Sequence, residues 1–177
     1  MDEETTPAET GPMAQEPRWL TSEEQDAWRS LAAIALRLPG ALDARMQRDA
    51  GLTLFEYLVL AELSEAPDRS RRMSNLAALT NGSLSRLSHV VKRLEQRGWV
   101  RREACPEDKR ATHAILTESG WAKTVASAPQ HVEAARHLVI DALTTTQLRH
   151  LPGMARRILE RIDPDEPCLP KPTRKAK

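Results

Sequence analysis

One face of the segment 83–98 carries side chains that could hydrogen-bond to nucleic acid. At 100° per residue the other face is apolar, which predicts burial of Leu84, Leu87, Val90, Val91 and Leu94. The polar face has hydroxyl, guanidinium, imidazole and ammonium groups and no acid: Ser85, Arg86, His89, Lys92, Arg93 and Gln96. These groups suit base edges, where arginine pairs with guanine, and phosphates, which attract cations.

The position of each residue along this segment predicts its contact. A recognition helix presents its first turns to base edges, so we expect Ser85, Arg86 and His89 there. Ser83, the N-cap of this helix, is also expected to contact DNA. Lys92 and Arg93 lie further along and are expected at phosphates. Each residue taken alone is equally typical of a solvated surface, and only the neighbouring elements favour nucleic acid.

The loop CPEDKR supplies a second candidate contact: Asp108, Lys109 and Arg110. An arginine at a loop tip can enter a narrow, negative minor groove, and Arg110 is suited to this. Asp108 lies two residues earlier, so both side chains can point the same way, and Asp108 would brace Arg110. The alternative is a local salt bridge within the turn.

The surrounding sequence predicts the elements that position these residues. Residues 73–80 indicate a short helix with Ser74 as its N-cap, and Asn81-Gly82 indicate a tight turn before the helix 83–98. Two short runs, 99–104 and 111–116, then indicate a β-hairpin around the CPEDKR loop. A helix-turn-helix followed by a hairpin predicts a winged helix.

Long amphipathic helices are predicted on both sides. Thr21 and Glu24 form a capping box for a helix ending at Gly51, which Pro39-Gly40 should kink or break, and Thr53 begins another that stops near Pro67. Thr117 caps a helix to about Leu143, and Thr144 with Gln147 caps the last one, which Pro152-Gly153 should interrupt early. The first and last helices have apolar stripes with little in the chain to bury them, so a second copy of the chain is the expected partner. The residues of these stripes are Leu31, Ile34, Leu38, Leu42, Leu148, Leu151, Ala155, Ile158 and Ile162.

The predicted fold class is mostly α with a small β-hairpin wing, the winged helix-turn-helix lying between dimerisation helices. The chain is predicted to begin with a disordered acidic tail (1–17) and to end with a disordered Pro-rich basic tail (163–177). Between them are predicted an N-terminal dimerisation region (18–51), the winged helix (52–117) and the C-terminal dimerisation helices (118–162).

The charge distribution supports a nucleic-acid partner although the formal net charge is only +1. Residues 70–112 hold ten Lys and Arg against four acids, a net of +6. Residues 1–30 hold eight acids against two Arg, a net of −6. The basic excess therefore coincides with the predicted winged helix, as expected of a DNA-contacting module.

The motifs RMS-x-LA, S-x-SRLS-x-VV-x-RLE-x-RGWV and D-x-R-A…LT, within residues 52–122, closely resemble the multiple-antibiotic-resistance regulator (MarR) family. The resemblance implies a homodimeric transcription regulator, usually a repressor, on a pseudo-palindromic operator in double-stranded DNA. It implies that 83–98 is the recognition helix and Arg110 the wing arginine, with half-sites about 10 bp apart. Pro39-Gly40 and Pro152-Gly153 depart from the family's unbroken helices.

Many members of this family respond to small aromatic or phenolic compounds, others to oxidants through a cysteine. Trp28, Phe55 and Tyr57 are the candidate effector-pocket residues, with ordinary core positions as the alternative. Cys105 lies beside the wing and Cys168 in the tail, so neither predicts redox sensing.

Other chemistry is not predicted. Glu133, His137 and Asp141 have i, i+4, i+8 spacing that could suit a metal, but solvated helix pairs explain it more simply. No nucleophile–base pattern, phosphate loop or dinucleotide motif is present, so we expect no catalytic residue, metal or cofactor. No apolar run nears the roughly 20 residues that a membrane helix needs, and the expected location is the cytoplasm. The alternative function is a winged-helix module that docks an acidic protein partner and has no operator.

Overall fold

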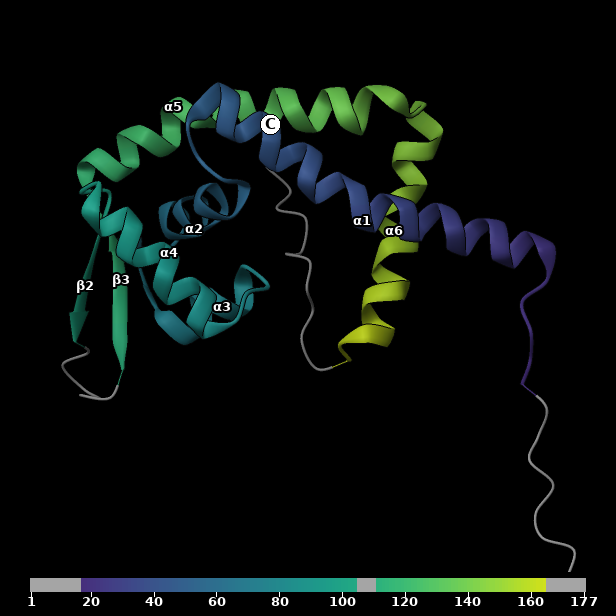
Figure 1. Cartoon of the computed structure of the whole chain (residues 1–177), viewed down its shortest axis with the longest axis horizontal. Helices are drawn as coiled ribbons and strands as arrows, with labels where there is room; N and C mark the ends of the chain where they lie inside the picture. The colour runs from purple at the N-terminus through teal and green to yellow at the C-terminus, as the bar shows by residue number, and fades with distance from the viewer. Residues whose placement is uncertain (1–16, 105–110, 165–177) are drawn as a thin grey trace, which may run out of the picture. The chain divides into compact units, whose positions relative to one another are not determined.

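The computed structural model describes residues 17–104 and 111–164. The chain divides into two compact units, Met1–Leu36 and Arg37–Lys177. The fold is mostly helical with one small antiparallel sheet, which confirms the predicted class (Figure 1). None of the described helices has the length and apolar character needed to cross a membrane.

Helix α1, Ser22–Ala50, begins with the predicted capping box: Glu24 N–H donates to Thr21 Oγ1 at 3.2 Å and Thr21 N–H to Glu24 Oε2 at 2.9 Å. Of the two expectations for Pro39-Gly40, the break into two helices is wrong, because α1 is continuous, and the kink stays a prediction. Proline removes one N–H donor, and the hydrogen bonds on either side maintain the helix. Gly51, at φ +64°, ends it, and Lys123 Nζ donates to the Ala50 carbonyl at 2.6 Å.

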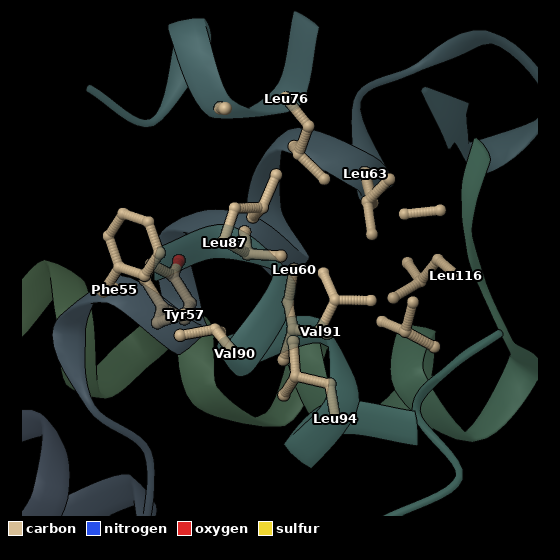
Figure 2. Close-up of a cluster of buried hydrophobic side chains, with 14 of the residues drawn as sticks. Phe55, Tyr57, Leu60, Leu63, Leu76, Leu87, Val90, Val91, Leu94 and Leu116 are labelled. Atoms are coloured by element: carbon tan, nitrogen blue, oxygen red, sulfur yellow. The ribbon is translucent and has the colours of Figure 1, made fainter. Parts of the chain in front are cut away.

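The winged helix contains three helices and a three-stranded sheet. The helices are α2 (Leu54–Ser64), α3 (Met73–Leu79) and α4 (Leu84–Gln96). The strands are β1 (Ser70–Arg72), β2 (Val100–Ala104) and β3 (Thr112–Leu116), in the antiparallel order β1-β3-β2. Buried side chains of all three helices and the sheet meet in one core (Figure 2).

The predicted hairpin of β2 and β3 is confirmed, but β1 was not predicted. Its three residues have no alternating pattern, and the strand forms because Arg71 pairs with Ala114 on the free edge of β3. The assignment of Ser74 as the N-cap of α3 is wrong. Arg72 occupies that position without a side-chain cap, since β1 leads directly into the helix.

Two expectations about α4 and α5 also need correction. Leu84 was predicted to be buried, yet it is 54% exposed, because the first turn of α4 extends beyond the core. Helix α5, Glu118–Leu138, is shorter than predicted, and a 3₁₀ turn, Ile140–Ala142, follows it. Its predicted N-cap is confirmed: Thr117 Oγ1 accepts from Gly120 N–H at 3.0 Å.

Helix α6, Thr145–Ile162, begins with the predicted Thr144–Gln147 capping box. The expected interruption at Pro152-Gly153 is wrong, because the helix continues through both residues. As in α1, the loss of one N–H donor does not outweigh the hydrogen bonds of the neighbouring turns. No residue of α6 is buried.

Candidate nucleic-acid interface

The turn before α4 places its N-terminus against α2. Asn81 has a positive φ of 48°, and an added Cβ at Gly82 would lie 2.7 Å from Phe55 Cζ. Only glycine permits this approach, so the turn packs on the Phe55 ring. Ser83 then caps α4 as predicted, because its Oγ accepts from Arg86 N–H at 3.2 Å.

The apolar face of α4 determines which side chains point outward. Leu87, Val91 and Leu94 are fully buried and Val90 is 4% exposed, all within the core (Figure 2). Burial of four residues at this spacing determines which face of the helix points into the core. The predicted polar face is accordingly exposed: Ser85, Arg86, His89, Lys92, Arg93 and Gln96.

Two arginines of this polar face lie at its edge and contact α2. The Arg86 guanidinium lies 4.2 Å from the centre of the Phe55 ring, a cation–π arrangement. Arg93 Nε donates to Glu56 Oε1 at 3.2 Å. A hollow of about 370 Å³ borders this edge, lined by Asp43, Thr53, Phe55, Arg86, His89, Val90 and Arg93.

The other edge of α4 is joined to the sheet. Arg102 of β2 pairs with Glu95 at 2.6 Å, and its N–H donates to the same carboxylate at 3.0 Å. A second hollow, of about 390 Å³, lies at this edge and is lined by Arg72, Met73, Ser74, Leu84, Ser88, Arg102, Ala111 and Thr112. Sequence reasoning did not single out Ser88 or Arg102 as contact candidates, because only folding brings β2 beside α4.

The predicted wing residues Asp108, Lys109 and Arg110 lie outside the described residues. The strands that carry this loop are described and pair in register from Val100–Leu116 to Ala104–Thr112. The role of these three residues remains a prediction.

The three effector-pocket candidates have different surroundings. Phe55 and Tyr57 are each 7% exposed and belong to the core (Figure 2). The Tyr57 ring centre lies 4.6 Å from that of His131 of α5. Trp28 lies in the first unit, on α1, and is 61% exposed.

The contact between α2 and α5 contains polar atoms without partners. Within the described residues, Ser127 Oγ and His131 Nδ1 are buried and form no hydrogen bond. Burial lowers the pKa of His131 below its ordinary 6.5. Burial, with a smaller effect of Glu65, raises the pKa of Tyr57. Both shifts favour the neutral side chains in the folded protein.

A helix-turn-helix followed by antiparallel wing strands defines the class of winged helix-turn-helix proteins. Residues 50–111 match the MarR family model. Sco3205, a MarR family transcriptional regulator from Streptomyces coelicolor crystallised in complex with DNA, is 47% identical, with a TM-score of 0.80 over 86% of this chain and 95% of that chain. AbsC, another MarR family regulator from this organism, is 39% identical, with a TM-score of 0.77 over 84% of this chain and 100% of that chain.

The transcriptional repressor MprA of Escherichia coli strain K12 is 29% identical over 121 residues, 67% of each chain. The chain therefore belongs to the MarR family of transcriptional regulators, which confirms the resemblance seen in its motifs.

Proposed function

We propose that this protein binds a pseudo-palindromic operator in double-stranded DNA as a homodimer and represses nearby genes. The observation that carries the proposal is the outward face of α4, which presents hydrogen-bond donors and cations and no acid. The 47% identical relative crystallised with DNA supports the same partner. Base contacts are assigned to Ser85, Arg86 and His89, with Ser83 beside them at the N-cap, and phosphate contact to Lys92. In the wing, contact is assigned to Lys109 and Arg110, with Asp108 as the brace of Arg110.

The homodimer is proposed because both terminal regions have unburied apolar side chains. Leu31 and Ile34 of α1 are 41% and 57% exposed, and Ile158 of α6 is 43% exposed. Residues 18–51 and 118–162 would form the interface, and residues 52–117 would bind DNA. Sedimentation velocity should show a dimer, and a monomer at all micromolar concentrations would contradict this.

Release by a small aromatic or phenolic effector is the last part of the proposal. Of the three candidate pocket residues, Tyr57 has a neighbour that favours such a ligand: its ring centre lies 4.6 Å from that of His131, whose Nδ1 is buried without a partner among the described residues. A ligand screen that measures release from DNA tests this part, and no release by any such compound would contradict it.

Gel-shift titration with the DNA beside the protein's own gene, against unrelated competitor, tests DNA binding directly. Arg86→Ala should cost about 1–3 kcal/mol of binding and relax specificity, as expected for a base contact. Arg110→Ala should weaken binding to all sequences and reduce its salt dependence. Binding without sequence preference, with an acidic protein partner recovered instead, would favour the protein-docking alternative.

Repression is tested separately by transcript levels of the neighbouring genes. Deleting the gene for this protein should raise them. A fall in those transcripts would identify an activator instead.

A further inference from the structure

Glu56, in the first turn of α2, is a nearly fully buried acidic side chain. It is 3% exposed, and its two oxygens have different partners. Oε2 accepts from Thr53 N–H at 2.9 Å, completing the capping box of α2. Capping occupies only this oxygen, and a buried carboxylate needs further charged or hydrogen-bonding partners to offset its desolvation.

Those partners come from α4 and its C-cap. Arg93 Nε donates to Glu56 Oε1 at 3.2 Å, and Arg97 Nη1 lies 3.8 Å from Oε2. Arg93 and Arg97 are four residues apart, so they share one edge of the helix and reach the same carboxylate. On the opposite edge, Glu95 pairs with Arg102 of β2. The end of α4 is therefore held on both sides, by α2 and by the sheet.

The neighbouring cation Lys92 differs from Arg93 in its surroundings. Lys92 is exposed and, within the described residues, forms no hydrogen bond or ion pair. Arg93 is 49% exposed and has its Nε directed at Glu56. The polar pattern of the sequence places both at phosphates, whereas, of these two residues, only Lys92 has a charge without a partner in the described part of the chain.

We infer that Glu56 and Arg93 act together as positioning residues that fix the rotation of the recognition helix, so that Arg93 affects operator selection through Glu56 and not as a phosphate ligand. The inference rests on the proposed function. Base contacts depend on the direction of Ser85 and His89, which a small rotation of α4 about its axis would change. Loss of the Glu56–Arg93 contact removes one of the two polar contacts that, together with the buried apolar face, restrain that rotation.

The experiment measures binding of the full-length protein to its operator and to an unrelated duplex over a range of salt concentrations. Arg93→Gln should lower the ratio of operator to unrelated binding at least about fivefold while leaving the salt slope unchanged. Glu56→Gln should lower the ratio similarly, and the double variant should be no worse than either single variant, because the two residues act as a unit. Lys92→Ala is the matched control and should reduce the salt slope by about 1 on both duplexes.

The outcomes separate this inference from the proposed function. If Arg93→Gln lowers the salt slope by about 1 and Glu56→Gln leaves the operator preference unchanged, Arg93 is a phosphate ligand and the inference is overturned. A purely structural role would reduce thermal stability without changing the preference of the folded protein, which also overturns it. Circular dichroism at the binding temperature establishes folding, and if Glu56→Gln does not fold, the half-exposed Arg93→Gln decides the result. A wild-type protein without operator preference overturns the proposed function and this inference with it.

Discussion

Helices α4 and α6 are both amphipathic, yet only one of them has its apolar face covered. In α4, Leu87, Val91 and Leu94 are fully buried. In α6 no residue is buried, and Leu151 and Ile158 are 40% and 43% exposed. The same helical periodicity therefore has two outcomes: α4 completes the core of its own chain, whereas α6 presents a face suited to a second copy.

The largest expected difference between these helices comes from shortening a leucine on each. Leu87→Ala should lower the free energy of unfolding by about 2–5 kcal/mol, because it leaves a cavity in the packed core. Leu151→Ala should weaken the dimer and leave the fold of the winged helix intact. Urea unfolding measures the first effect and sedimentation velocity the second. An unchanged dimer dissociation constant for Leu151→Ala would remove the proposed distinction.

A pair of glycine variants extends the comparison to the backbone. An added Cβ at Gly120, at the start of α5, would lie 2.0 Å from the Trp99 carbonyl oxygen, and backbone cannot move aside cheaply. Gly120→Ala should therefore cost about 3 kcal/mol of stability. Gly153 of α6 has nothing within 4 Å of such a Cβ, so Gly153→Ala should stabilise the helix by about 0.5–1 kcal/mol. Thermal denaturation of both variants measures this, and equal losses would contradict it.

The smallest expected effect concerns α5, which is covered on only one side: Ser127 is 1% exposed and Val132 is 55% exposed. Because burial lowers the pKa of His131 below 6.5, the unfolded chain binds its proton more readily than the folded protein does. Stability should thus be lost as pH falls below about 6.5. His131→Phe keeps an aromatic ring against Tyr57 and should flatten this dependence. Urea midpoints between pH 5 and 7 measure it, and an identical slope in wild type and variant would exclude His131 as the cause.

Local features of the fold could be predicted because they depend on residues close in sequence. The caps at Thr21, Ser83, Thr117 and Thr144 each join a side chain to a backbone N–H three residues later, and all four are confirmed. The helix-turn-helix and the hairpin followed from the same kind of local pattern. Strand β1 could not be predicted, because its three residues form a strand only beside β3.

The two proline-glycine pairs show that helix propensity alone overestimates how much a proline disrupts a helix. Pro39 and Pro152 each remove one hydrogen bond, and propensity treats this as a break. In the folded chain α1 and α6 both continue through their proline-glycine pairs.

The sequence by itself determined the class of the protein: its motifs, its caps and the separation of apolar from polar residues on the segment 83–98. Only the tertiary structure decided what each polar residue of that segment does. Glu56 and Arg93 are 37 residues apart and meet at 3.2 Å, while the adjacent Lys92 is exposed. Periodicity specifies which face of a helix is polar, but the partner of each side chain depends on which other element packs beside it.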